Sequence, residues 1–286
     1  MKKLSKRFKI LIVTIILLIV FCIWQNNSAV VSSSDYYSSK IPADFNDFKI
    51  VQISDLHNKM FGEDQSKLLS QVESLSPDII IVTGDLVDRR KFDLDIAMCF
   101  INGAVEIAPT YYVSGNHEAW SGKYSQITHQ LMEAGVYIMD DTALELSKGS
   151  STIQILGLSD PDFLTSDYLE GTNTSKLEEQ LKQWSRSDKF KILLSHRPEL
   201  FDLYRESNID LIFSGHAHGG QFRIPFVGGL VAPDQGLFPQ YTIGSYSNES
   251  STMFVSRGLG NSIIPIRIFN RPEIVVVTLK SMNKRL

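Results

Sequence analysis

Thiol groups are scarce in this chain: its 286 residues include only two cysteines, Cys22 and Cys99. Cys22 lies inside an N-terminal apolar run, and Cys99 lies in a stretch (95–100) typical of the buried face of a helix. Two such residues exclude a structural zinc site of the Cys-rich kind and do not indicate a disulfide framework. We interpret both as unreactive buried thiols.

The chain also lacks a surplus of positive charge. Its 28 basic and 32 acidic side chains give a net charge of −4, which falls to −9 when the five basic residues near the N-terminus are set aside. Proteins that bind nucleic-acid backbones carry the opposite balance. We therefore expect no nucleic-acid partner. If the protein acts on phosphate groups, metal ions should supply most of the positive charge.

One long hydrophobic run is present, at the N-terminus. Residues 10–24 are apolar except for Thr14, and they follow five basic residues and no acidic one. The pattern is typical of a signal anchor or a secretory signal peptide. Because no clear cleavage motif follows, we favour an uncleaved single-pass anchor with its N-terminus inside and the following domain outside the cytoplasm. Secretion after cleavage is the alternative.

Three segments are predicted along the chain. The membrane anchor or signal segment covers residues 1–26, a Ser- and Asn-rich stretch at 27–46 is interpreted as a flexible tether, and one folded domain covers 47–286. In that domain, apolar runs typical of buried strands alternate with helical patterns, as in α/β proteins. One of these helices is expected at 124–135, with Gly135 at its end.

The C-terminal part is expected to be less regular. Residues 221–251 are rich in Gly, Pro and aromatic side chains and are predicted to form a long loop beside the site. The runs 252–260, 264–269 and 273–279 are predicted to be antiparallel strands.

Five of the predicted strands end in polar residues that are suited to metal binding. Polar groups just beyond the carboxyl ends of buried strands meet at the edge where α/β sheets place their ligands. Five of the six histidines lie in these positions, and we expect the sixth, His129, to be an ordinary helix residue. The polar residues in question are Asp55, His57, Asp85, Asn116, His117, His196, His216 and His218.

Imidazole and carboxylate ligands without thiolates favour two divalent ions, either Mn²⁺, Fe²⁺ or Zn²⁺, over a structural zinc ion. Asp85 is the natural candidate to bridge the ions, and Asn116 adds a neutral oxygen. Two ions roughly 3.5–4 Å apart lower the pKa of a bridging water and hold phosphoryl oxygens. Such a centre is typical of phosphoester hydrolysis.

The motifs also carry a family resemblance. DLH at 55–57, GDLVD at 84–88, GNHE at 115–118, SH at 195–196 and GHAHGG at 215–220 resemble the five ordered motifs of the calcineurin-like metallophosphoesterases. The resemblance covers about residues 48–280. It implies an α/β fold, a four-layer α/β/β/α sandwich with two central mixed β-sheets, preceded here by one transmembrane helix. The membrane segment, DLHNKMFG and GHAHGGQ resemble the subgroup that includes UDP-2,3-diacylglucosamine pyrophosphatases.

The resemblance implies a role for most of these polar residues. His117 would be catalytic, protonating the leaving oxygen or stabilising its charge. Asp88 and Glu118 would orient the ligands, with ordinary loop carboxylates as the alternative. Arg197 and Arg257 are candidates for substrate binding, with structural ion pairs as the alternative. The metal ligands would be Asp55, His57 and His218 for one ion, Asn116, His196 and His216 for the other, and Asp85 for both.

The sequence thus predicts a membrane-anchored, dinuclear metal-dependent phosphoesterase. It would hydrolyse a phosphomonoester, phosphodiester or pyrophosphate at the cell envelope through a metal-bridging hydroxide, with a phosphorylated small molecule or lipid-linked compound as substrate. Three alternatives stay open: a glycolipid pyrophosphatase of the UDP-2,3-diacylglucosamine type, an exported nuclease, and a non-catalytic binding protein that keeps the fold. Specificity is expected to depend on residues 158–175 and 221–248.

Overall fold

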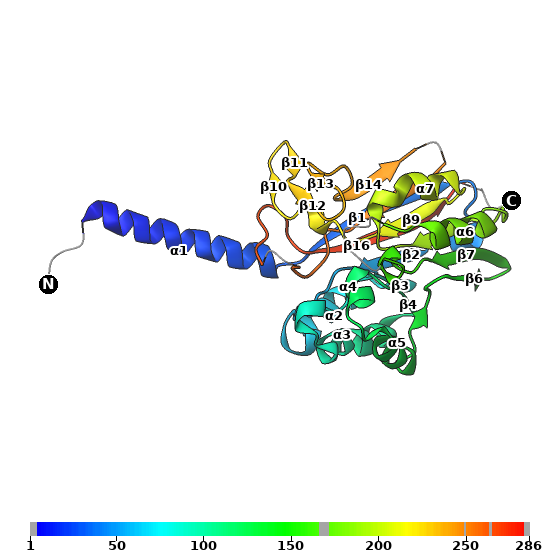
Figure 1. Cartoon of the computed structure of the whole chain (residues 1–286), viewed down its shortest axis with the longest axis horizontal. Coiled ribbons are helices and arrows are strands. Elements are labelled where there is room, and N and C mark those ends of the chain that lie inside the picture. Colours follow the sequence, from blue (N-terminus) through cyan, green and yellow to red (C-terminus); the bar gives the residue numbers. More distant parts are fainter. Residues whose placement is uncertain (1–4, 166–171, 249, 263–264, 283–286) are drawn as a thin grey trace.

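Two six-stranded mixed sheets pack face to face at the centre of the molecule, and helices cover their outer faces (Figure 1). The structure is a computed structural model that describes residues 5–165, 172–248, 250–262 and 265–282. Aliphatic side chains from both sheets, such as Ile79 and Ile192, form the shared core. The predicted four-layer α/β/β/α arrangement is confirmed.

The first sheet is mostly parallel. Strands β2 to β5 run in the same direction, while β16 is antiparallel to β2 and parallel to β1. All five residues of β3 are buried, as expected for a strand that is covered on both faces. In spatial order the strands are β1 (Val30–Ser38), β16 (Glu273–Ser281), β2 (Lys49–Ile53), β3 (Ile79–Thr83), β4 (Thr110–Val113) and β5 (Tyr137–Ile138).

The second sheet has four parallel central strands and an antiparallel strand at each edge. Two short hairpins follow β9: β10 (Arg223–Ile224) with β11 (Gly228–Gly229), and β12 (Val231–Ala232) with β13 (Gly236–Leu237). In spatial order the strands of the sheet are β14 (Gly244–Ser247), β15 (Thr252–Val255), β9 (Leu211–Ser214), β8 (Lys191–Leu194), β7 (Ser151–Gly157) and β6 (Thr142–Lys148).

Amphipathic helices cover the outer faces of both sheets. Helices α2 (Ser66–Ser74), α3 (Leu94–Ile107) and α5 (Tyr124–Glu133) pack on the first sheet, and α6 (Ser175–Trp184) and α7 (Phe201–Glu206) pack on the second. The short α4 (Asn116–Trp120) follows β4 directly, and the long α1 (Lys6–Asn27) projects away from the domain (Figure 1). Short 3₁₀ turns are η1 (Ala43–Phe45), η2 (Glu63–Gln65), η3 (Arg89–Lys91), η4 (Pro161–Phe163), η6 (Pro198–Leu200) and η7 (His218–Gly220).

Gly135 ends the α5 region as predicted. Its φ of 95° lies in the left-handed range that glycine adopts without strain, and its N–H donates to the Met132 carbonyl at 3.0 Å.

The tether prediction is wrong for residues 30–38. These residues form edge strand β1, which pairs with β16 along its whole length, and only Ser28 and Ala29 separate it from α1. The open edge of β16 offers unpaired backbone groups to an extended segment, and the valines and tyrosines of β1 favour that conformation. The serine-rich composition concealed a strand because an edge strand needs few buried side chains.

The C-terminal predictions are correct in part. Strand β16 is antiparallel to β2, but it is parallel to β1, and β15 is parallel to β9. Residues 265–269 contribute only an isolated bridge from Ile268 to Phe222. The expected loop 221–251 contains the two hairpins and β14. Part of the expected specificity segment, residues 166–171, and part of the expected strand at 264–269 lie outside the described residues.

Candidate metal centre

The predicted polar residues all follow the carboxyl ends of strands, and the structure brings them together. Asp55 and His57 follow β2, Asp85 follows β3, and Asn116 begins α4 after β4. From the second sheet, His196 follows β8, while His216 and His218 follow β9. Each of these side chains is buried, as is that of His117. The histidines and aspartates among them form overlapping groups, and within each group the ligand atoms lie within 4.8 Å of one another.

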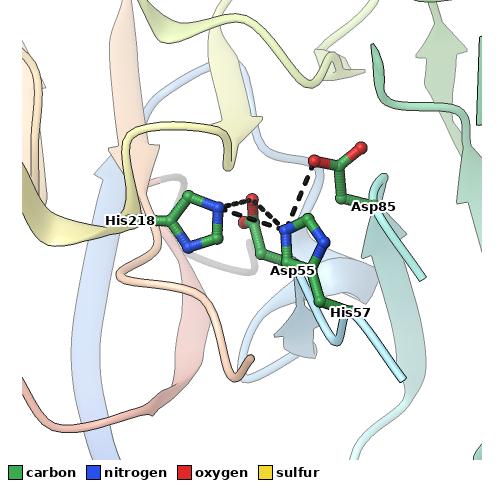
Figure 2. A group of neighbouring side chains, drawn as sticks. All are labelled: Asp55, His57, Asp85 and His218. Carbon is green, nitrogen blue, oxygen red and sulfur yellow. Dashed lines mark hydrogen bonds and ion pairs between the residues drawn. The ribbon is translucent and has the colours of Figure 1, made fainter. Parts of the chain in front are cut away.

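The first group contains two imidazoles and two carboxylates. Figure 2 shows the rings of His57 and His218 facing each other beside the carboxylate of Asp55, with Asp85 next to them. The two Nε2 atoms are 3.1 Å apart. The Nε2 of His57 is 3.4 Å from Asp85 Oδ2, and that of His218 is 3.4 Å from Asp55 Oδ1. Four ligand atoms therefore converge on one point.

The second group shares Asp85 with the first. Its Oδ2 is 3.3 Å from His196 Nε2, and His196 Nε2 is 3.2 Å from His216 Nδ1. His196 Nδ1 donates to the Thr83 carbonyl at 2.7 Å, which orients the ring so that Nε2 faces Asp85. The same carboxylate oxygen thus faces histidines of both groups, as a bridging ligand requires.

The donor set fits divalent cations. Asn116 Oδ1 is buried and has no hydrogen-bond partner, so a carbonyl oxygen is available beside the second group. Among the described residues, neither Asp55 nor Asp85 forms an ion pair with a lysine or arginine, although both are buried. Buried carboxylates are costly unless cationic groups neutralise them. These clusters indicate a site for divalent cations.

Two of the histidines are neutral, as metal binding requires, while a third is paired with a carboxylate. Burial lowers the pKa of His57 to about 3 and lowers that of His218 as well, so both rings stay neutral and keep a lone pair. Burial alone would raise the pKa of Asp85, but His196 and other histidines hold it well below its usual range. For His196, burial is outweighed by Asp85, which raises the pKa of the ring to about 10.

Much of the centre is built on unusual backbone. Asp55, His57, Asp85, His216 and His218 all have φ between 45° and 65°, in the left-handed region that side chains other than glycine rarely adopt. Such conformations cost free energy and cluster at functional sites, where the surrounding structure enforces them. This backbone conformation changes the direction of each side chain at the point where the chain leaves its strand.

Gly258 completes this packing and was missed by the sequence reasoning. Its φ is 68°, and a Cβ at this position would lie 2.6 Å from the Cβ of Asp55. The loop after β15 therefore passes directly against a ligand carboxylate. No motif marks this glycine, because the contact joins segments about two hundred residues apart.

The two predicted orienting carboxylates make different contacts. Glu118 is fully buried and accepts hydrogen bonds from the backbone N–H groups of Asp85 (2.8 Å), Gly115 (2.8 Å) and Val87 (3.2 Å). Burial, reinforced by Asp85, raises the pKa of Glu118 to about 8. Asp88 pairs with Arg90 and lies 3.8 Å from the Nδ1 of His117. Glu118 thus holds the loop that carries Asp85, while Asp88 faces His117.

His117 lies at the edge of the first group. Its ring packs against that of His57 with centroids 4.5 Å apart, and its backbone N–H donates to Asp85 Oδ1 at 2.9 Å. The backbone N–H of Arg89 donates to His117 Nδ1 at 3.2 Å, so in the neutral ring the proton resides on Nε2. That Nε2 is 3.4 Å from the hydroxyl of Ser262.

The predicted substrate-binding arginines make ion pairs, which matches the alternative given for them. Arg257 Nε lies 3.5 Å from Glu273. Arg197 is buried among carboxylates, and one of these, Asp234, also accepts a 2.8 Å hydrogen bond from His216 Nε2. The carboxylates around Arg197 are those of Asp160, Asp162, Glu199 and Asp234.

Asp234 and Arg267 are further neighbours of the site that the sequence did not reveal. Arg267 is fully buried, donates to the carbonyl groups of Arg257 and Gly260, and approaches His218 Nδ1 to 3.4 Å. Both residues lie in irregular segments, where no periodicity or motif indicates which way a side chain points.

A cavity of about 620 Å³ opens beside His57. Its wall includes Asp88, Asn261 and Ser262, together with the basic residues Arg90 and Lys91. A cavity with cationic side chains next to a metal centre suits an anionic ligand.

Comparison with known proteins identifies the family. The model of the calcineurin-like phosphoesterases matches residues 48–220, which is more than half of the chain. An uncharacterized metallophosphoesterase of Bacillus subtilis, YkuE, is 36% identical over 254 residues, covering 86% of this chain and 84% of the relative. A Danio rerio transmembrane protein with a metallophosphoesterase domain is 26% identical over 84% of this chain and 55% of its own length.

A solved structure shows the same fold. The crystal structure of TT1561 from Thermus thermophilus superposes with a TM-score of 0.50 at 16% identity, covering 74% of this chain and 89% of the other. The transmembrane relative and the long apolar helix α1 both suggest membrane association. On the family match, the relatives and the clustered ligands, the chain belongs to the calcineurin-like phosphoesterase family and is a metal-dependent phosphoester hydrolase.

Proposed function

We propose that this protein hydrolyses a phosphomonoester, phosphodiester or pyrophosphate bond at the cell envelope with two divalent ions. The observation that carries the proposal is the position of Asp85, whose Oδ2 lies 3.4 Å from His57 Nε2 and 3.3 Å from His196 Nε2. One carboxylate oxygen between two histidine groups is the arrangement that a dinuclear centre needs.

Seven side chains would hold the ions. Nitrogen and oxygen donors without thiolate suit Mn²⁺, Fe²⁺ or Zn²⁺. When bound, such a pair lowers the pKa of a water molecule and stabilises negative charge on phosphoryl oxygens. We assign Asp55, His57 and His218 to one ion, Asn116, His196 and His216 to the other, and Asp85 to both.

Other residues would act on the substrate directly. His117 holds a proton on Nε2 and can donate it, or a hydrogen bond, to the leaving oxygen. Arg90 and Lys91 line the cavity beside His57 and attract the anionic substrate. Glu118 contributes by fixing the backbone around Asp85, which keeps the shared ligand in place.

The location is part of the proposal. We assign α1 as a retained single-pass anchor, with its basic N-terminal end inside and the catalytic domain outside the cytoplasm. Contacts between the end of α1 and the domain support retention, since Gln25 is buried and Arg271 donates to Ser28. A mature protein whose N-terminus begins after residue 28 would contradict this assignment.

The test separates metal binding from catalysis. Asp85→Ala and His117→Ala are compared with His129→Ala, a change at an exposed residue of α5. Metal content is measured by mass spectrometry, and turnover is measured on soluble nitrophenyl phosphomonoesters and phosphodiesters. Asp85→Ala should lose metal and activity. His117→Ala should keep both ions and lose roughly 10²–10⁴-fold in kcat.

Two outcomes would contradict the proposal. If His117→Ala loses its metal, the role assigned to His117 is wrong. If fully metal-loaded wild-type protein hydrolyses no phosphomonoester, phosphodiester or pyrophosphate, the proposed hydrolytic function of the centre is wrong.

A further inference from the structure

The metal centre lies at the end of the sheet where α1 joins the domain. Strand β1 leaves α1 after two residues and runs parallel to β16, which is antiparallel to β2. Strands β3 and β4 run with β2, so their carboxyl ends point back toward α1. These are the strand ends that carry Asp55, Asp85 and Asn116. Figure 1 shows α1 leaving this end of the domain.

Direct contacts join the last turn of α1 to the site. Asn26 Oδ1 accepts hydrogen bonds from Asn261 Nδ2 and from the backbone N–H of Arg267, each at 3.1 Å. Asn261 lines the cavity beside His57, and Arg267 approaches His218 to 3.4 Å. A single side chain therefore separates the end of the apolar helix from a metal-centre histidine.

The length of α1 and the contacts of its last residues indicate where the membrane–water interface lies. The helix is 22 residues long, about 33 Å, which matches the hydrocarbon thickness of a bilayer. The guanidinium carbon of Arg271 lies 4.7 Å from the centroid of the Trp24 ring. A pair of aromatic and basic side chains of this kind suits the membrane–water interface. Phe21 lies one turn deeper, by about 4–5 Å. The Phe21 ring packs against the ring of Phe269, with the two ring centroids 5.7 Å apart.

Phe269 is continuous with an exposed apolar surface, the apolar tip, which we define as Ile224, Phe226, Val227 and Phe269. These residues line one cavity around the β10–β11 turn. Phe226 is fully exposed, and Val227 and Phe269 are more than half exposed. In Figure 1 this hairpin lies at the end of the domain nearest α1. Large apolar side chains gathered at one exposed place mark an interaction site.

We propose that the apolar tip enters the same lipid bilayer as α1 and is a second membrane contact of the catalytic domain. The occupant is lipid because Phe269 contacts α1 at the level of Phe21, deeper than the Trp24–Arg271 pair. Together with α1, the tip holds the mouth of the metal centre toward the lipid headgroups. The contact rests on the proposed assignment of α1 as a retained anchor, but it is independent of which phosphoester is hydrolysed, so it can fail while the proposed hydrolytic activity holds.

The experiment uses the full chain in vesicles of phosphatidylcholine and phosphatidylglycerol. In a background of Cys22→Ala and Cys99→Ala, an environment-sensitive fluorophore is attached through Phe226→Cys. The matched control is Met132→Cys, an exposed apolar residue on α5. We expect the label at 226 to shift its emission to shorter wavelength and to be quenched by lipids with nitroxides on their acyl chains. The label at 132 should stay unshifted and unquenched.

A label at a second position, residue 227, is needed because replacing Phe226 could itself remove the contact with the bilayer. Val227→Cys should behave like Phe226→Cys, since both side chains belong to the apolar tip. Emission at both positions that matches the control at 132 would overturn the proposal. A shift to shorter wavelength without quenching by lipid would also overturn it, because protein rather than bilayer would then cover the tip.

Discussion

Asp85 connects the two halves of the metal centre more directly than any other described ligand. Its Oδ2 faces histidines of both groups, its Oδ1 accepts from the backbone of His117, and its own N–H donates to Glu118. The backbone N–H and both carboxylate oxygens of Asp85 therefore each face a group of a neighbouring residue. The strained φ of 53° at this residue is maintained by these contacts.

A titrating group outside the metal centre gives a test at the residue scale. Asp140 accepts hydrogen bonds from the Ser114 N–H (2.8 Å) and from the Tyr124 hydroxyl, and burial raises its pKa to about 6. Because the folded pKa lies above the ordinary value of 3.8, the protonated form stabilises the fold. This contribution is complete below about pH 4 and is lost as pH rises through about 6.

The comparison is between wild type and Asp140→Asn, which stays neutral. Between about pH 4 and 7 the wild type should lose on the order of 2–3 kcal/mol of unfolding free energy relative to the variant. Urea unfolding in detergent micelles at several pH values measures this difference. Parallel pH profiles for the two proteins would show that Asp140 does not titrate in this range.

At the scale of elements, strand β1 has the largest consequence for the architecture. It joins α1 to the catalytic domain and lies at the edge of the first sheet, paired only with β16. The Val30 N–H donates to the Pro272 carbonyl at 2.8 Å. Because parallel pairing uses every second residue, the Ser34 N–H is expected to face β16 and the Ser33 N–H to face solvent.

Proline tests this pairing with a matched control. Ser34→Pro removes a ladder hydrogen bond and should lower the unfolding free energy by about 1–3 kcal/mol more than Ser33→Pro. Both side chains are exposed, so lost side-chain packing would not account for a difference in stability between the two variants. Thermal unfolding in micelles measures the effect. Equal melting temperatures would mean that β1 contributes no stability through this register.

The domain extends from the end of α1 to the far end of the sheets (Figure 1). The strand directions place the metal centre at the end of the first sheet nearest α1. Contacts at the end of α1 hold this arrangement. Asn26 accepts from Asn261 and Arg267, and Arg271 donates to Ser28 and packs on Trp24. These contacts fix the orientation of α1 relative to the domain.

Breaking these contacts should loosen the orientation. In a Cys99→Ala background, spin labels on Cys22 and on Met132→Cys report the distance between α1 and the domain. Asn26→Ala combined with Arg271→Ala should broaden the distance distribution. The double variant loses the two hydrogen bonds that Asn26 accepts and the contacts of Arg271 with Ser28 and Trp24. His129→Ala, in exposed surface, should leave it unchanged. A distribution as narrow as in the wild type would show that β1 and the remaining contacts, such as the Phe21–Phe269 pair, fix the helix without these side chains.

The sequence by itself determined the layered α/β fold, the ligand types and their places at strand ends. The alternation of strands and helices follows from hydrophobic periodicity, and the layered sandwich is what the family resemblance of the short motifs implies. Its errors fall where the pattern is weak. The serine-rich β1 has few buried side chains, and the direction of β15 depends on a partner strand.

Only the tertiary structure decided which atoms meet. His57 and His218 are 161 residues apart in sequence, yet their Nε2 atoms are 3.1 Å apart. The closeness of Gly258 to Asp55, the carboxylates around Arg197 and the docking of α1 beside the cavity likewise join distant segments. Such contacts depend on how two sheets and their loops pack together. No local pattern encodes them, because each side chain's neighbours are set by the fold as a whole.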